Sequence, residues 1–320
     1  MKHIKLLYLF LLISWSSLPL QAADYLLQSP NGKLTVEIET KGQLSYTLKH
    51  NSQTLLDKSP IGLLLEDKIL GEDIKISRIK RNSSVKEHIV SPHYRLPSFE
   101  VTYNELNLKF KGNYGIIFRA YNEGIAYRFY TTMKGPLIIK DEMVQMNFPE
   151  DYPTFMSYST MPTGEDQYAM AFQNLYTKSS IKGVDTNNIA FLPITIDCGN
   201  ELKMTLLESD LEDYPGMFIK GDGKNTSLQG TFAHYPSEIK NFPPRAMKRI
   251  TKRTDYIART TGERNYPWRI WAITEKDTEM PVNNLVYALA SPNRIGDCSW
   301  IKTGKVAWDW WNDWGISDVD

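Results

Sequence analysis

Cysteine and net charge are both scarce in this chain of 320 residues. Its 37 Lys and Arg balance 37 Asp and Glu, so we expect no general attraction to nucleic acid or to anionic membranes. The two cysteines, Cys198 and Cys298, fit no spacing motif, and two alternatives stand: a disulfide, which an oxidising compartment would permit, or two buried thiols. The five histidines are scattered and show no Cys/His spacing typical of a zinc site.

Long apolar runs are also lacking, apart from one at the N-terminus. Residues 1–5 carry positive charge, residues 6–13 are almost entirely apolar, and residues 21–23 supply small side chains. The run is too short for a transmembrane helix and is typical of a signal peptide, which we expect to span residues 1–22. Because no second apolar span follows, we predict a periplasmic or secreted protein without a membrane span.

The sequence contains no convincing long amphipathic helix. Residues 282–289 have no clean period, and we expect either a strand or a short helix there. Residues 34–39 and 44–49 instead alternate apolar and polar side chains, which is typical of strands with one buried face. The Gly-containing connection at Gly42 joins these two runs as a β-hairpin.

A meander of three more strands is predicted over residues 106–110, 116–121 and 125–130, joined by tight turns. Other strands are expected at 189–197, 202–207, 227–232 and 268–273. Many strands with little helix indicate a mainly β protein built as a large antiparallel β-sandwich.

A tryptophan-rich segment follows residues 297–304. Its members are Trp308, Asp309, Trp310, Trp311, Asn312, Asp313 and Trp314. Flat apolar rings beside carboxylates and an amide suit a sugar pocket, and residues 306–308 could form a buried strand that presents them at its end. The alternative is a hydrophobic anchor that packs on a partner domain.

An acidic stretch, residues 208–213, follows the strand predicted at 202–207. It is either a solvated loop or an oxygen-rich edge that binds a hydrated ligand or Ca²⁺. The aromatic content of 12% carries a similar pair of interpretations, because aromatic rings stack on sugars and also fill β cores.

Several of these segments together resemble glycoside hydrolase family 97, a family of exported α-glucosidases and α-galactosidases. The matching stretches occur in the family's order, at 29–32, 121–128, 207–217, 266–269 and 304–314. The last of them is the most specific, and it is more similar to the retaining, α-galactosidase-like branch than to the inverting α-glucosidases.

The resemblance implies an N-terminal β-super-sandwich, expected at residues 23–296, followed by a (β/α)₈ barrel. Residues 297–320 would then be a linker and the first strand of a truncated barrel, because a barrel needs about 250 residues. The family's catalytic carboxylates come from later barrel strands, so this chain alone is expected to be inactive. The resemblance leaves a sugar-lining role for one set of residues: Trp308, Asp309, Trp311, Asn312 and Asp313.

The resemblance also implies a Ca²⁺ ion between sandwich and barrel, with one Glu donated by the sandwich. Gln173 stands at that position here, and its carbonyl oxygen could bind Ca²⁺ without contributing charge. The alternative is that Gln173 is an ordinary polar residue.

Three functions follow as hypotheses. The chain is part of a glycoside hydrolase whose sandwich completes a catalytic barrel, with an α-linked oligosaccharide as ligand. Alternatively it is a stand-alone carbohydrate-binding protein, or a structural partner that docks through residues 308–314. We favour the first, because it accounts for both the order of the motifs and the tryptophan-rich segment.

Overall fold

The computed structural model describes residues 24–91, 94–159, 166–169, 174–242, 247–302 and 304–306. In this part of the chain the protein is mainly β, and its strands pair antiparallel. The strands of the first half are β1 (Tyr25–Gln28), β2 (Leu34–Glu39), β3 (Ser45–His50), β4 (Gln53–Leu65), β5 (Ile69–Leu70), β6 (Ile76–Val90), β7 (Ser98–Phe110), β8 (Tyr114–Tyr121) and β9 (Gly124–Asn147).

The second half adds ten strands and three short helices within the described residues. The strands are β10 (Pro153–Tyr158), β11 (Thr177–Ser180), β12 (Ala190–Asp197), β13 (Lys203–Ser209), β14 (Met217–Gly221), β15 (Ser227–Phe232), β16 (Pro236–Phe242), β17 (Met247–Arg253), β18 (Ala258–Asn265) and β19 (Trp268–Thr274). The helices are the 3₁₀ turns η1 (Gln167–Ala169) and η2 (Asp277–Val282) and the single α-helix α1 (Leu285–Leu289).

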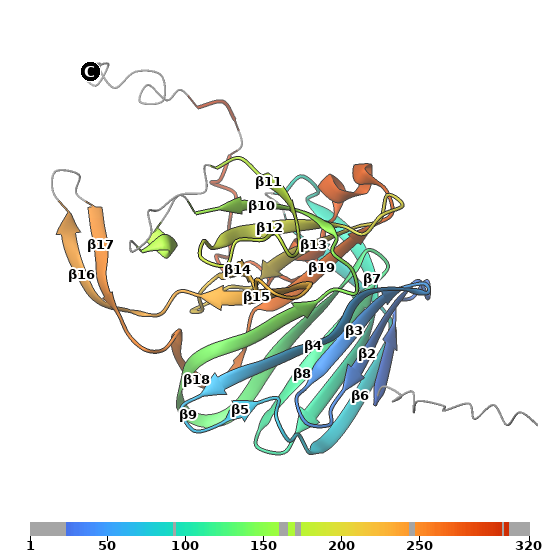
Figure 1. Ribbon diagram of the computed structural model, residues 1–320, viewed down its shortest axis with the longest axis horizontal. Helices are drawn as coiled ribbons and strands as arrows, with labels where there is room; N and C mark the ends of the chain where they lie inside the picture. Colours follow the sequence, from blue (N-terminus) through green and yellow to red (C-terminus); the bar gives the residue numbers. More distant parts are fainter. Residues whose placement is uncertain are drawn as a thin grey trace, which may run out of the picture.

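Two long strands organise the layers. The first part of β4 pairs with β3 and its last part with β9, so that β4 joins the β1–β4 layer to the larger sheet. Strand β9 pairs in turn with β8, β18, β19, β4 and β15 along its 24 residues. Strands β16 and β17 form a separate two-stranded sheet, an arm that projects from the body (Figure 1).

The main core lies between the β1–β4 layer and the larger sheet. The side chains of β2 alternate between the two faces of the strand. Those on the inner face, Leu34, Val36 and Ile38, are almost fully buried. They belong to one apolar cluster with inward residues of β7 and β8. The indole Nε1 of Trp271 donates a hydrogen bond of 3.0 Å to the Tyr46 hydroxyl, which joins β19 to β3 across this core.

A second apolar cluster covers the opposite face of the sheet. Helix α1 buries Leu285, Ala288 and Leu289 there, together with Trp268 and Ile270 of β19. Helix α1 and η2 occupy the segment for which the sequence predicted either a strand or a short helix. The hairpin at 34–49 and the meander at 106–130 are confirmed.

Several predictions concern residues outside the described part of the chain. The signal peptide at 1–22 is one of them and stays a prediction. The expected first barrel strand at 306–308 falls there except for Val306, and the described residues 297–302 and 304–306 form no strand. Both cysteines are free thiols, with Cys198 buried and Cys298 partly exposed.

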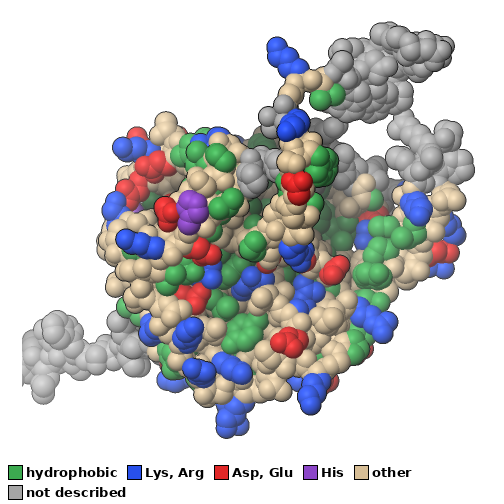
Figure 2. All heavy atoms as spheres, turned by 180° about the vertical axis from the view of Figure 1, so that it is seen from behind, with side chains coloured by type: hydrophobic (Ala, Val, Ile, Leu, Met, Phe, Trp, Pro, Cys, Tyr) green, Lys and Arg blue, Asp and Glu red, His purple; other side chains and the backbone are tan. Residues whose placement is uncertain are grey.

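The surface of the described residues agrees with the balanced composition. Acidic and basic side chains are interspersed on the face shown in Figure 2. No helix within the described ranges is long and apolar enough to cross a membrane.

Candidate functional site

The residues predicted to bind sugar lie outside the described part of the chain. This applies to Trp308, Asp309, Trp311, Asn312 and Asp313, and also to Gln173, the expected Ca²⁺ ligand. Their roles stay predictions. What the structure does place is the group of motifs that precede them, and these motifs meet in space.

Three stretches that are far apart in sequence converge around Arg128 on β9. Its Nη2 donates to the Asp210 carboxylate at 3.0 Å, and its Nε donates to the Tyr266 carbonyl at 2.9 Å. Its guanidinium also lies over the Trp268 ring, 4.8 Å from the centroid. The side chains of Arg128 and Asp210 are only 10% and 9% exposed, so this ion pair is nearly buried.

A second arginine, Arg269, lies deeper in the same region and is 1% exposed. Its Nε and Nη2 donate to the two carboxylate oxygens of Glu142, at 2.9 and 2.6 Å. Its Nη1 donates to Glu208 at 2.6 Å, and the backbone N–H of Met217 donates to the same carboxylate. One guanidinium therefore binds two carboxylates, Glu142 in a bidentate fork-to-fork geometry and Glu208 through a single hydrogen bond.

Burial sets the electrostatics of this cluster. It raises the pKa of Glu208, and the nearby Arg269 charge opposes that rise. Two carboxylates and one cation leave a net negative charge in the interior. Such an arrangement is stable only while all partners remain paired, because a single buried ion left alone pays its full desolvation cost.

The acidic stretch at 208–213 is divided: residues 211–213 are exposed, as expected of a solvated loop, whereas Glu208 and Asp210 are not. Glu208 and Asp210 are turned inward onto arginines, and Glu212 pairs with Arg294 at 2.6 Å. Within the described residues, no group of three or more His, Cys, Asp or Glu side chains is arranged to hold a metal ion. Arg128 and Arg269 lie in two of the matching stretches, at 121–128 and 266–269, but the sequence did not show that they pair with these carboxylates.

The same stretch anchors the linker that follows α1. The Asp210 carboxylate accepts a 3.1 Å hydrogen bond from the backbone N–H of Ser291. Both Glu212 oxygens accept from the Arg294 guanidinium, at 2.6 and 3.0 Å. Residues 208–213 thus fix the path by which the chain leaves the β domain, and we call this contact the linker anchor.

We expect Asp210→Asn to loosen the linker anchor. An amide keeps an acceptor for Ser291 but removes the charge opposite Arg128, so the free energy of unfolding should fall by about 2 kcal/mol. Trypsin should then cleave after Arg294 faster than in the parent protein, as followed by mass spectrometry.

Glu212→Gln is the matched control, because its ion pair with Arg294 is largely exposed, at 48% and 73%. It should change the unfolding free energy by less than about 0.5 kcal/mol. Equal unfolding midpoints for Asp210→Asn and the parent would contradict the assignment.

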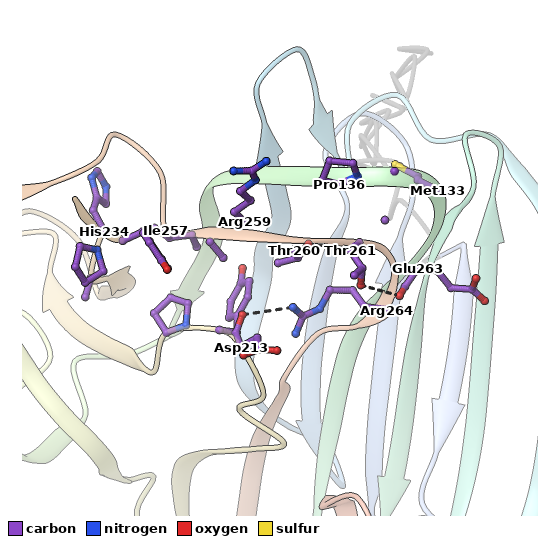
Figure 3. A pocket seen from close by; sticks show the side chains of 18 of the residues that line it. Met133, Pro136, Asp213, His234, Ile257, Arg259, Thr260, Thr261, Glu263 and Arg264 are labelled. Atoms are coloured by element: carbon purple, nitrogen blue, oxygen red, sulfur yellow. Dashed lines mark hydrogen bonds between the residues drawn. The ribbon is translucent and has the colours of Figure 1, made fainter. Parts of the chain in front are cut away.

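A groove of about 1180 Å³ opens beside this cluster, along β18 and the base of the β16–β17 arm. His234 and Ile257 lie toward one end and Glu263 toward the other, with Arg259 and Arg264 on opposite sides of the β18 ribbon (Figure 3). Residues 213–215, at the end of the acidic stretch and just after it, form part of the wall of this groove. We call this feature the arm groove.

Arg264 is held rigidly at the wall of the arm groove. Its guanidinium donates to the carbonyl oxygens of Glu212, Asp213 and Asn265, at 2.7, 3.4 and 3.1 Å. It also lies over the rings of Tyr214 and Tyr266, 5.7 and 5.1 Å from their centroids. Since all its described partners are neutral, its charge is not cancelled by a carboxylate in contact with it.

The antiparallel β domain and the order of its motifs agree with the N-terminal domain that the resemblance implied. The family model described as "Glycosyl-hydrolase 97 N-terminal" matches residues 27–292. The chain belongs to this family, which confirms the resemblance drawn from the sequence.

Two curated proteins are similar to this chain in sequence. A "Retaining alpha-galactosidase" of Bacteroides thetaiotaomicron is 37% identical over 324 residues, covering 99% of this chain and 48% of the relative. A "Probable retaining alpha-galactosidase" of Streptomyces bingchenggensis is 23% identical over 292 residues, covering 88% of this chain and 39% of the relative. The chain thus spans about half or less of the length of these relatives.

Solved structures share the fold. A glycoside hydrolase family 97 enzyme from Pseudoalteromonas sp. strain K8, in complex with acarbose, superposes with a TM-score of 0.70 at 18% identity. The match covers 87% of this chain and 40% of that chain. A β-arabinopyranosidase gives a TM-score of 0.66 at 17% identity, covering 79% and 40%.

Proposed function

We propose that this chain is the N-terminal β domain of an exported glycoside hydrolase that acts on α-linked galactosides or glucosides, with α-galactosides preferred. The catalytic carboxylates would lie on a barrel that the β domain packs against. In this proposal the sandwich supports the barrel and contributes to sugar binding at their boundary.

The observation that carries the proposal is the extent of one alignment. Identity of 37% to a retaining α-galactosidase extends over 99% of this chain, yet covers only 48% of that relative. About three of the 320 residues of this chain lie outside the alignment, so the aligned part includes the tryptophan-rich segment. The linker anchor supports the proposal further, because residues 208–213 hold Ser291 and Arg294, which follow α1, against the β domain.

The finer assignments are part of the same proposal. Trp308, Asp309, Trp311, Asn312 and Asp313 would line the sugar site, with rings that stack on pyranose faces and polar groups that bind hydroxyls. Gln173 would offer a neutral oxygen to Ca²⁺. The described residues provide no carboxylate cluster that would complete that ion's ligands. Export after cleavage of residues 1–22 would place the protein in the periplasm or outside the cell.

A chimera tests the proposal. The segment of the Bacteroides relative that aligns with this chain is replaced by this chain, and hydrolysis of p-nitrophenyl α-galactopyranoside is measured. We expect turnover within about tenfold of the relative, a loss of about 1.4 kcal/mol in transition-state stabilisation. This chain alone should give no turnover, since the carboxylates are supplied by the rest of the relative.

The control is the same chimera carrying Asp309→Asn, which separates a sugar-lining role from a catalytic one. A folded chimera without activity would overturn the proposal. Turnover by this chain alone that Asp309→Asn abolishes would also overturn it, because catalysis would then reside here. Oligosaccharide affinity in an inactive chimera would favour a stand-alone binding protein.

A further inference from the structure

The arm groove has the composition of a ligand site that the proposed function does not use. Four of its charged side chains have no hydrogen bond or ion pair from their side chains within the described residues: Lys134, Arg259, Asp213 and Glu263. They carry both signs, and Arg264, which is held but not neutralised, also lines the groove.

The mixture of signs selects the kind of ligand. A polyanion would be attracted by Lys134, Arg259 and Arg264 but would meet the two like charges of Asp213 and Glu263. A sugar hydroxyl both donates and accepts a hydrogen bond, so adjacent hydroxyls use cationic and anionic side chains together. The arm groove therefore suits a neutral, hydroxyl-rich ligand better than a charged one.

An aromatic platform lies at one end of the arm groove. Tyr235 is 51% exposed, and its ring stacks on Tyr256 with centroids 5.9 Å apart and an interplanar angle of 20°. The stacking holds the exposed ring in one orientation, which reduces the entropy lost on binding. Pro215 and Pro236 add apolar surface to the lining of the groove.

We propose that the arm groove binds a neutral oligosaccharide, with Tyr235 stacking on one pyranose ring and the free charged residues binding hydroxyls along β18. The groove's volume of about 1180 Å³ is enough for several sugar units, since drug-sized ligand pockets are about 300–1,000 Å³. The inference rests on the proposed function only for the choice of carbohydrate as the ligand class. It adds a second place where the β domain holds a glycan.

Calorimetric titration of the full chain tests this inference. The probes are stachyose and maltoheptaose as neutral oligosaccharides, with an oligogalacturonate as the anionic comparison. We expect saturable binding of at least one neutral probe with a dissociation constant below about 10 mM, and weaker binding of the oligogalacturonate. Tyr235→Ala should raise the dissociation constant of the neutral probe about tenfold.

Two controls make the outcome decisive. Tyr287→Ala removes another exposed tyrosine that stacks on a tyrosine, Tyr94, but lies outside the arm groove, and it should leave affinity unchanged. Trp311→Ala in the full chain is the second control, because it reports on the sugar site proposed at the tryptophan-rich segment. If Trp311→Ala abolishes binding and Tyr235→Ala does not, the sugar binds at the tryptophan-rich segment; the inference is then overturned while the proposed function stands. No saturable neutral binding, or tighter binding of the oligogalacturonate, also overturns it.

Discussion

Replacing Arg269 with Met should be among the most damaging single changes in the β domain. The side chain is 1% exposed and pairs with Glu142 and Glu208, so its loss leaves two buried carboxylates without a cation. We expect the free energy of unfolding to fall by about 4 kcal/mol at pH 7, as measured by urea denaturation. That is a large part of the roughly 5–15 kcal/mol by which domains are stable.

The pH dependence of the Arg269→Met variant provides a second measurement. Burial already raises the pKa of Glu208, and removal of Arg269 should raise it further. The folded variant then binds more protons than its unfolded chain, so its stability should fall as pH rises from 5 to 8. Its deficit relative to the parent should therefore be smallest near pH 5.

Arg78→Met is the control for charge removal alone, since Arg78 on β6 is exposed and makes no ion pair within the described residues. It should change the unfolding free energy by less than about 0.5 kcal/mol. An Arg269→Met protein with the parent's urea midpoint at pH 7 would show that the carboxylates do not depend on this cation.

Replacing Gly124 with Ala should be damaging for a steric reason. Gly124 begins β9 with φ of +155°, and an added Cβ would lie 2.3 Å from the Trp271 carbonyl oxygen and 2.6 Å from Leu285 Cδ1. The backbone of β19 cannot retreat without breaking its pairing with β9. We expect a loss of about 3 kcal/mol or more, combining overpacking with backbone strain.

Gly135→Ala separates the two contributions. Gly135 also has positive φ, at +75°, but nothing lies within 4 Å of an added Cβ. Its replacement should cost about 1 kcal/mol from strain alone. The comparison is made by thermal unfolding, and similar melting temperatures for the two variants would refute the steric argument.

The sequence predicted several of the strands whose burial is one-sided and local. Residues 34–39 and 106–110 alternate because one face meets the core, and this pattern is visible without knowledge of the partner strand. Strand β6 was missed because it pairs only with β7 among the described strands and buries little, so its apolar positions are sparse. The Gly135-Pro136 pair is typical of a turn, yet β9 continues through it opposite an irregularity in β18.

The candidate site was predictable in part. The family was recognised from the sequence, and the family match over residues 27–292 confirms it. The role of the acidic motif was not, because Arg269 lies 61 residues from Glu208 and 127 from Glu142. No local pattern links residues at such separations, and a carboxylate in a loop has the same sequence signature whether it faces water or a buried guanidinium.

The sequence by itself determined the β class, the family and the order of the motifs, since these depend on local periodicity and on residue identity. Only the tertiary structure decided which charges are paired and which are free. Glu208 and Asp210 are enclosed with arginines because β13 lies beside β19 and β9 carries Arg128 nearby. Asp213, a few residues later, stays exposed at the arm groove. Chain neighbours are thereby separated into structural and ligand-accessible groups, because packing against distant strands sets the solvation of each side chain.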